Sequence, residues 1–481
     1  MNPQQPEPQS GALPLSYDHH TDTEREISSS SYSAKEIFAG SSPTENDCNN
    51  VLIIYARALI WTRAMFRAAT LRAARESWHV DGQVKSLGFA ALMLIRILMF
   101  VTLSGERSNA QFLSHDHPLE AGEIKLGMSN AQTGRLGFLG TALRQGCLAY
   151  LSRANKEGGV SGRRLVLVDY DDRYEPIEAV SNTERLIDRD KVFALLNFLG
   201  TPTCRSIMPM LNEAHIVLLG PISGAIFLRQ PMQPVIFNTR ASYEEEAEVL
   251  VAHVISDLGC KRIALFRQDD SYGEAGRIAV VDALHRRGLQ LVGEGDYVRN
   301  SVRAPDALYR IAKTKPDAVI LFGTYKPCAD FIRESKKIGL KKTVFCNVSF
   351  VGTEPLIKYL AEDGDGVIIS QVVPSPFDQS LPLVRDYQTD MRAIGETEFS
   401  YMSLEGYVNS LIMVTALRRA GPDLTEDALI HSLENLNIDF RSFAIHFSPD
   451  TRQGTHQVFL TKIAHGRSVP IEKLDPADFA R

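Results

Sequence analysis

The sequence has 481 residues and a mass of 53.4 kDa, which allows two to four domains. Hydrophobic residues make up 44% and charged residues 23%, and the formal net charge is -6. These values exclude a disordered, collagen-like or multi-span membrane protein for most of the length, and they give no global attraction to nucleic acid. Six cysteines are too few for a disulfide scaffold of this size.

The first 85 residues differ from the rest in composition. Residues 1–50 are rich in Ser, Pro and Gln and hold eight acidic against two basic side chains. Residues 51–85 reverse the sign, with six basic against two acidic side chains. Residues 1–50 have few large apolar side chains and cannot offset their chain entropy, so we expect disorder there and assign 1–85 to one disordered extension.

An apolar segment follows this extension. Leu87–Leu103 is apolar except for Arg96, and the small-residue pattern ending at Ala110 comes after it. A basic stretch, an apolar core and small residues predict a signal peptide over 86–110, cleaved after Ala110. A membrane anchor through 87–103 is the alternative, but the segment is short of the roughly 20 residues needed, and a central arginine costs about 2.5–3.5 kcal/mol.

Signal peptides begin near a natural N-terminus, so the written start is expected to lie upstream of the true one. Met65 or Met93 is the expected start, and Met93 would place Arg96 in the basic part of the signal. No cysteine for lipid attachment follows the apolar segment, which favours a free periplasmic protein over a lipoprotein.

From about residue 122, short apolar strands alternate with amphipathic helices, a pattern that predicts parallel sheets covered by helices. We expect strands at 124–128, 164–170, 192–197, 216–219, 262–266, 289–297, 318–322, 344–347, 366–370, 443–447 and 458–463. We expect helices at 136–151, 176–188, 202–212, 243–258, 274–287, 305–313, 327–338, 383–393, 403–420 and 425–433.

So many strands exceed one comfortable core, which predicts an α/β protein with two interleaved Rossmann-like lobes. Proline-rich stretches at 230–234 and 374–376 bracket the middle of the chain. We therefore assign 122–241 plus 373–440 to the first lobe and 242–372 plus 441–470 to the second. A ligand cleft and a hinge are expected between them.

Catalytic motifs are missing from the sequence. It has no Walker A loop, HExxH or GxSxG motif, and the glycines at 158–162 follow a helix rather than the strand that a dinucleotide fingerprint needs. Asp171-Asp172 and Asp269-Asp270 are interpreted as solvated turn residues, and the cysteines lack metal-ligand spacing. Cys147 fits a core position, and a bridge between Cys328 and Cys346 stays open. We expect no catalytic residue, metal or cofactor.

The chain from about Ile124 to Ile463 resembles the substrate-binding proteins of ABC importers, specifically the leucine/isoleucine/valine-binding type with the periplasmic-binding-protein type I fold. The motifs that carry this resemblance, in order, are Thr133-Gly134, Gly140, Asn155-Lys156-Glu157-Gly158-Gly159-Val160-Ser161-Gly162-Arg163, Tyr170-Asp171-Asp172, Glu175-Pro176, Leu219-Gly220-Pro221, Asp270-Ser271-Tyr272-Gly273 and Ser403-Leu404-Glu405-Gly406-Tyr407.

The resemblance implies that a ligand binds between lobes that close on a hinge. In the first lobe, Thr201 and Thr203 would hold a ligand carboxylate at a helix start, which suits an anion because its N–H groups are free. The alternative is that Thr201 only caps the helix. The remaining ligand contacts implied for the first lobe are Leu139, Ile222, Ser223 and Gly224, where Ser223 would replace the hydroxyl that Gly224 lacks.

In the second lobe, the resemblance implies that Tyr272 and Tyr325 close over the ligand. Ser349 stands where the family has an acidic partner for the ligand ammonium, and a buried ammonium without a carboxylate is costly. A carboxylate or amide without an ammonium is therefore a candidate beside a branched-chain amino acid, unless Asp269 or Asp270 compensates. The family's disulfide positions correspond to Tyr174 and Gly200, so that bridge is absent.

Together these features predict an exported, non-enzymatic, monomeric receptor that presents a small polar ligand to the membrane permease of an ABC importer. No nucleic-acid partner is expected. The alternatives are the ligand-sensing module of a signalling system and an α/β enzyme.

Overall fold

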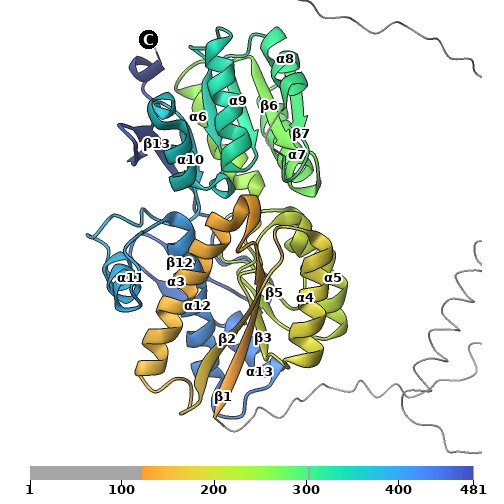
Figure 1. The fold of residues 1–481 in the computed structure, drawn as a ribbon, viewed down its shortest axis with the longest axis vertical. Coiled ribbons are helices and arrows are strands. Elements are labelled where there is room, and N and C mark those ends of the chain that lie inside the picture. The colour runs from red at the N-terminus through yellow and green to blue at the C-terminus, as the bar shows by residue number, and fades with distance from the viewer. Residues whose placement is uncertain (1–121, 302–303, 480–481) are drawn as a thin grey trace, which may run out of the picture. The chain divides into compact units, whose positions relative to one another are not determined.

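The computed structural model describes residues 122–301 and 304–479, which belong to one compact unit, Gln111–Arg481 (Figure 1). The expected extension, signal peptide, anchor and alternative starts lie outside the described residues. Within the described part, no helix combines the length and apolar character needed to cross a membrane. The unit contains two α/β lobes, each built on its own main sheet.

The first lobe holds a five-stranded parallel sheet in the order β2-β1-β3-β4-β5. Side chains alternate between its faces, so Leu219 packs with α3 and α12 while the neighbouring Leu218 packs with α5. Its elements are β1 (Glu123–Asn130), α3 (Gly137–Lys156), β2 (Arg164–Asp171), α4 (Pro176–Glu184), β3 (Ala194–Leu196), α5 (Thr201–Glu213), β4 (Leu218–Leu219), β5 (Ile236–Phe237), α11 (Pro382–Ala393), α12 (Tyr401–Ala420), α13 (Glu426–Glu434), β11 (Asn437–Asp439) and β12 (Ala444–His446).

The second lobe holds a seven-stranded sheet in the order β14-β13-β10-β9-β8-β6-β7. Leu265 packs toward α6 and α7, and Phe266 toward α8 and α9. Its elements are α6 (Tyr243–Ser256), β6 (Ile263–Gln268), α7 (Ser271–His285), β7 (Gly293–Tyr297), α8 (Pro305–Lys313), β8 (Ala318–Phe322), α9 (Tyr325–Lys337), β9 (Val344–Asn347), α10 (Thr353–Leu360), β10 (Ile368–Gln371), β13 (Phe459–Ala464) and β14 (Arg467–Ile471).

Parallel pairing holds for β7, β6, β8, β9 and β10, as the alternating pattern predicts. One edge of this sheet differs, because β13 pairs antiparallel with both β10 and β14. These strands follow one another through a tight turn at Gly466 with no helix between them, so an antiparallel hairpin is the only short connection.

The chain crosses between the lobes after β5, after β10 and before β13. The sequence assigns 441–470 to the second lobe, but Phe443, Ile445 and Phe447 lie in the core of the first lobe. Asn238 donates its backbone N–H to the carbonyl of Arg452, which ties the first and last crossings together. Three adjacent crossings form the connection between the lobes.

Local chemistry fixes where the helices begin. Proline occupies the first turn of α4, α8 and α11, where a missing N–H costs nothing. The Ser242 side chain accepts from the N–H of Glu245, whose carboxylate accepts from the N–H of Ser242, so a capping box starts α6. Asp270 caps α7 by accepting from the N–H of Tyr272. The caps on α6 and α7 position helices that carry candidate site residues.

The five described cysteines, Cys147 among them, are all buried free thiols, so Cys328 and Cys346 form no bridge. Asp172 corrects the expectation of solvated acid pairs, because it is fully buried and accepts from Ser129 Oγ and the N–H of Tyr174. Burial raises its pKa to about 7 despite these hydrogen bonds. Among residues 122–301 and 304–479, no group of three or more His, Cys, Asp or Glu side chains is placed to hold a metal ion.

Candidate functional site

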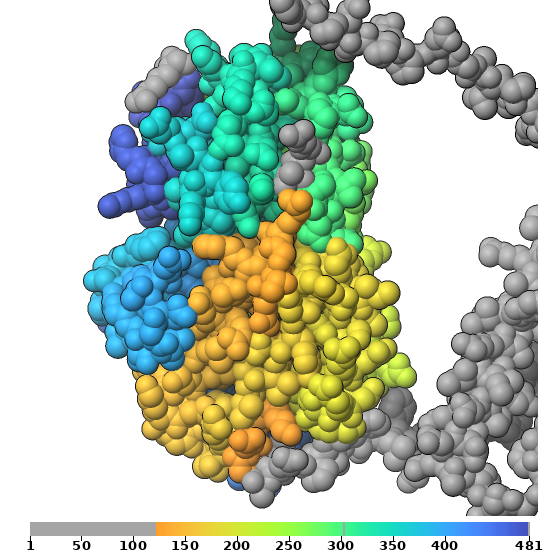
Figure 2. Space-filling model, in the orientation of Figure 1, coloured from red at the N-terminus to blue at the C-terminus, as the bar shows by residue number. Residues whose placement is uncertain are grey.

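Loops at the carboxyl ends of the parallel strands in both lobes meet where the lobes touch, the usual place for ligands in α/β folds. Figure 2 shows this contact on one face, where the orange and yellow atoms of the first lobe abut the teal and green atoms of the second. All nine residues expected to bind ligand are buried: Leu139, Thr201, Thr203, Ile222, Ser223, Gly224, Tyr272, Tyr325 and Ser349.

A cluster of hydroxyl groups forms at the start of α5. The Oγ1 atom of Thr201 lies 2.8 Å from Ser223 Oγ and 3.3 Å from the phenolic oxygen of Tyr243. Thr201 is the first residue of α5, and Gly200 before it has φ 108°, a conformation that favours glycine. The free N–H groups of this helix start and the three hydroxyls together make an arrangement suited to a carboxylate.

The missing side chain of Gly224 makes room for Tyr243. A Cβ atom at position 224 would lie 2.5 Å from Tyr243 Cδ1, closer than real Cβ atoms approach. The hydroxyl that the sequence lacks at Gly224 is thus replaced in space by two others, from Ser223 and Tyr243. Ile222 pairs with Leu199 in a parallel bridge and fills the apolar cluster below.

Thr203 lies in the same helical turn as Thr201 but uses its hydroxyl differently. Its Oγ1 atom donates toward the carbonyls of Leu199, at 2.5 Å, and Gly200, at 2.8 Å. These contacts satisfy the hydroxyl within the loop, and the structure does not bring it to Ser223. Thr201 and Thr203 therefore form a natural pair for comparison.

Tyr272, at the start of α7, belongs to a group of aromatic rings under the hydroxyl cluster. Its ring centroid lies 5.4 Å from that of Tyr243 and 4.8 Å from that of Phe350. The Tyr272 hydroxyl is buried and has no hydrogen-bond partner in the described structure. An unsatisfied buried hydroxyl costs about 1–3 kcal/mol, so a hydrogen-bond partner at this atom would stabilise the protein.

Tyr325 and Leu139 join the two lobes directly. The Tyr325 hydroxyl, on α9 of the second lobe, donates to the carbonyl of Arg135 in the first at 2.6 Å. Leu139, on α3, packs closely on Gly352 in the loop after β9. Both expected residues thus lie at the lobe boundary.

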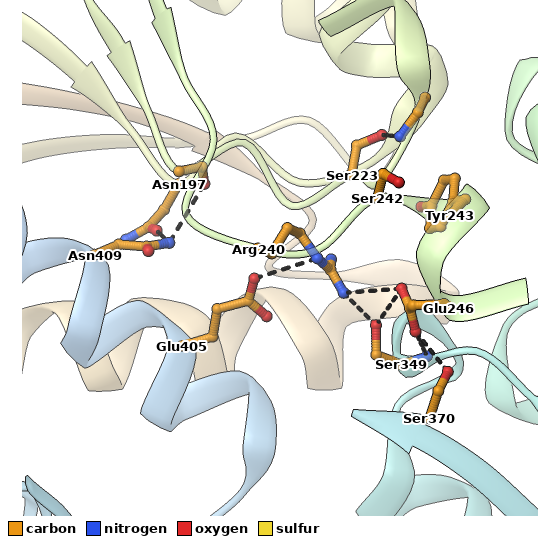
Figure 3. A network of polar contacts seen from close by, with 12 residues as sticks. Asn197, Ser223, Arg240, Ser242, Tyr243, Glu246, Ser349, Ser370, Glu405 and Asn409 are labelled. Atoms are coloured by element: carbon orange, nitrogen blue, oxygen red, sulfur yellow. Dashed lines mark hydrogen bonds and ion pairs between the residues drawn. The ribbon is translucent and has the colours of Figure 1, made fainter. Parts of the chain in front are cut away.

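Ser349 is surrounded by charges from distant parts of the sequence (Figure 3). Glu246, on α6, accepts from the Ser349 N–H at 2.8 Å, from its Oγ at 3.0 Å and from Ser370 Oγ at 2.6 Å. Arg240 donates to Ser349 Oγ through Nη2. A carboxylate therefore stands next to the position where the sequence shows only a serine.

Arg240 connects this carboxylate to a second one. Its Nη2 atom lies 3.9 Å from Glu246 Oε1, and its Nε atom lies 3.5 Å from Oε1 of Glu405 on α12 (Figure 3). All three side chains are at most 5% exposed. The Nε and Nη1 atoms of Arg240 and Oε1 of Glu405 make no hydrogen bond in the described structure. Two buried carboxylates thus face one guanidinium, which leaves a net charge of -1 when all are ionised.

The buried charges shift one another's protonation. Burial raises the pKa of Glu246 and of Glu405, although the Arg240 charge opposes the shift. Burial alone would lower the pKa of Arg240, but the charges of Glu405 and Glu246 outweigh it and raise that pKa. The guanidinium stays charged. The second carboxylate has no cation of its own, so its buried charge destabilises the group.

The described structure has a small cavity next to this charged group and a larger groove away from the expected site residues. A cavity of about 10 Å³, close to the space of one water molecule, is lined by Ser349, Gln371, Met402 and Glu405 among others. A larger groove of about 900 Å³ runs along α3 and the edge strand β2, and none of the nine expected residues lines it. The arrangement of site residues, rather than cavity size, therefore identifies the candidate site.

A sequence model of a family described as periplasmic binding proteins matches residues 123–468, nearly all of the described chain. The chain belongs to this periplasmic binding protein family. The family is one of solute-binding proteins, not of enzymes.

Relatives of this family member agree with the assignment. A possible leucine/isoleucine/valine-binding protein from Rhodopirellula baltica has 32% identity and a TM-score of 0.70, covering 74% of this chain and 98% of that one. The Leu/Ile/Val/Thr-binding protein of Salmonella typhimurium is 23% identical over 56% of this chain and 72% of its own. A branched-chain amino acid ABC transporter protein from Thermus thermophilus with bound valine shares the fold at a TM-score of 0.67 and 22% identity, covering 74% and 98%.

Sequence reasoning missed four residues of the candidate site in this family member: Arg240, Tyr243, Glu246 and Glu405. One pattern did indicate Glu246. The buried residues of α6 are Tyr243, Glu246, Ala247, Leu250, Val251 and Val254, so Glu246 falls on the apolar stripe of the helix. An acid on such a stripe needs a buried partner.

Proposed function

We propose that this protein is an extracytoplasmic receptor that captures a small polar ligand between its lobes and delivers it to the membrane permease of an ABC importer. Family membership and the names of its relatives support transport, amino acid ligands and a periplasmic location after export. A soluble monomer without enzymatic turnover is sufficient for this role.

The observation that carries the proposal is that hydroxyl groups from both lobes and a helix start lie together at the lobe boundary. The first lobe contributes the Thr201–Ser223 hydroxyl pair and a helix start, and the second contributes Tyr272 with its unpartnered hydroxyl. A ligand that contacts both lobes binds the closed arrangement best, so binding shifts the population toward closure. A closed receptor is then the form presented to the permease.

For the ligand we propose a branched-chain amino acid, with a related amide or carboxylate as the alternative. Ser349 stands where a carboxylate would pair with a ligand ammonium, but two other carboxylates lie close by. Glu246 accepts hydrogen bonds from Ser349, and Oε1 of Glu405 has no hydrogen-bond partner in the described structure. Two carboxylates against one guanidinium favour a ligand that brings a positive charge. The rings of Tyr243, Tyr272 and Phe350 offer an apolar surface for a hydrocarbon side chain.

A binding screen of the purified full chain tests this function. Leucine, isoleucine and valine, their deaminated acids and their amides are compared by thermal shift and calorimetry. A ligand at one hundred times its dissociation constant should stabilise the fold by about 2.7 kcal/mol. Preference for leucine over its deaminated acid supports the ammonium-bearing class, and equal binding favours the carboxylate class. No response to any compound would contradict the proposal.

Replacing Thr201 with valine is expected to weaken ligand binding roughly 10- to 100-fold, the usual value of a hydrogen bond to a charged group. Thr203→Val is the matched control, because its hydroxyl donates to the carbonyls of Leu199 and Gly200 and not to Ser223. The control should lower thermal stability and leave affinity within about three-fold of wild type. Calorimetry on both variants decides the matter, and equal affinity losses would count against the hydroxyl cluster as the carboxylate site.

A further inference from the structure

Tyr174 has an unusual place in the loop between β2 and α4. Its side chain is fully buried although the loop is short, and its φ of 62° lies in the left-handed region. A bulky residue with positive φ is strained unless surrounding contacts hold it. The N–H of Tyr174 donates to the buried carboxylate of Asp172 at 2.8 Å, which fixes the turn.

The ring of Tyr174 lies against the hydroxyl cluster. A Cβ atom at Gly200, the residue before Thr201, would overlap the Tyr174 ring, so the ring covers the glycine. Its centroid is 6.2 Å from that of Phe350 in the second lobe. It belongs to the same apolar cluster as Leu139 and Tyr272. The ring thus forms a wall of the candidate site.

The hydroxyl of Tyr174 reaches the second lobe. Gln268, at the end of β6, donates to it through Nε2 at 3.1 Å. The same Nε2 atom donates to Asp270 Oδ2 at 2.7 Å, and Asp270 caps the helix that begins with Ser271 and Tyr272. The Gln268 amide therefore links the Tyr174 hydroxyl directly to Asp270, the residue that caps α7.

A second branch leads to α9. Tyr297 donates its hydroxyl to Gln268 Oε1 at 3.1 Å and accepts the N–H of Thr324 at 2.9 Å. Thr324 directly precedes Tyr325, the first residue of α9. One buried network therefore runs from Tyr174 in the first lobe to the starts of both second-lobe helices that carry candidate site tyrosines.

The neighbouring residue reinforces this connection at the edge of the lobe boundary. Glu175 accepts from Arg299 Nη2 at 2.9 Å and from Asn300 Nδ2 at 2.6 Å, both in the loop after β7. Arg299 also lies 3.5 Å from Asp270 Oδ2. Two consecutive first-lobe residues thus bind one second-lobe network.

We propose that Tyr174 is a positioning residue that couples lobe closure to the alignment of Tyr272 and Tyr325, and that its ring limits the size of the ligand. This inference rests on the proposed receptor function for its ligand-size part, whereas the closure part concerns the protein alone. The ring acts on the first-lobe side, next to Gly200, and the hydroxyl acts through Gln268. The two parts of the side chain can therefore be tested separately.

The test compares Tyr174→Phe and Tyr174→Leu with Tyr387→Phe in the full chain. Tyr387 is also fully buried, but its hydroxyl contacts only Ser400 and Ser403 of the first lobe. X-ray scattering with and without ligand measures closure, and calorimetry with valine, leucine and phenylalanine measures affinity. Thermal unfolding reports loss of stability for every variant.

Tyr174→Phe is expected to bind all three ligands roughly three- to ten-fold more weakly and to be more open in scattering without ligand, because one interlobe hydrogen bond is lost. Tyr387→Phe should lower only the unfolding temperature. Tyr174→Leu should lower the ratio of phenylalanine to valine dissociation constants roughly ten-fold, because the wall recedes.

Scattering and affinity of Tyr174→Phe equal to wild type would overturn the coupling role. An unchanged ligand ratio for Tyr174→Leu would overturn the size role. If the wild type binds none of the three ligands, the proposed function fails, and the ligand-free scattering of Tyr174→Phe against Tyr387→Phe still decides the coupling role.

Discussion

Replacing Arg240 with methionine is expected to lower the free energy of unfolding by about 3–5 kcal/mol. The guanidinium is the buried cation between Glu246 and Glu405, and its loss leaves two buried carboxylates without that cation. Urea unfolding followed by circular dichroism measures the change. Methionine keeps most of the buried volume, so the loss reports charge more than packing.

The double variant Arg240→Met, Glu405→Gln is the control, because it removes the unsatisfied carboxylate together with the cation. It should recover at least about 1 kcal/mol of the loss, since neighbouring buried charges are strongly non-additive. Equal stability of the single and double variants would show that the loss has another cause.

The pH dependence supplies an independent check on Arg240. Burial raises the pKa of Glu246 and Glu405 in the folded state above their values in the unfolded chain. A carboxyl group with a raised folded pKa favours folding at low pH, and this advantage is lost as pH rises through the folded pKa. Without the opposing guanidinium charge the shift grows, so the deficit of Arg240→Met should shrink on acidification from pH 8 to pH 5. A deficit that grows over this range would contradict the charge argument.

Much of the fold follows from the sequence because strand and helix periods are local properties. Most strands of the two sheets and most of their flanking helices appear at the expected places, since alternation of short apolar runs with amphipathic helices leaves few other arrangements. The elements β5, α10 and β14 lie outside the expected ranges. The direction of β13 and the first-lobe position of Phe443 could not be predicted in the same way. Both depend on which surface a late segment covers, and periodicity carries no information about that.

Some residues of the candidate site could likewise be predicted from local sequence, and others could not. Residues at strand ends and helix starts, such as Thr201 and Tyr272, could be proposed because parallel strands bring their carboxyl ends together. Arg240 and Glu405 are separated by more than 160 positions, and charged residues are mostly exposed, so no local pattern pairs them. Gly224 illustrates a different limit of the sequence. It has no hydroxyl of its own, and the hydroxyl of Tyr243 comes from another element, α6, which no local pattern reveals.

Replacing Gly406 with alanine is expected to destabilise the protein by about 3 kcal/mol, the upper end of the cost of overpacking. Helix propensity alone predicts the opposite sign, a gain of about 1 kcal/mol for alanine over glycine within a helix. The structure decides between them, because a Cβ atom at Gly406 on α12 would overlap the carbonyl oxygen of Leu143 on α3. Gly146 on α3 is in the reciprocal situation, facing the carbonyl of Ser403. At both glycines the added Cβ atom would meet a backbone oxygen of the other helix, so the overlap cannot be relieved by moving a side chain.

Urea unfolding of Gly406→Ala and Gly146→Ala tests this crossing, with Thr141→Ala as the control on the exposed side of α3. The control should gain up to about 0.7 kcal/mol from helix propensity, whereas both glycine variants should lose stability. A gain in all three would mean that the helices separate at little cost. Because Glu405 directly precedes Gly406, a displaced α12 also moves the carboxylate that faces Arg240, so the same variants should bind ligand more weakly than their stability loss alone explains.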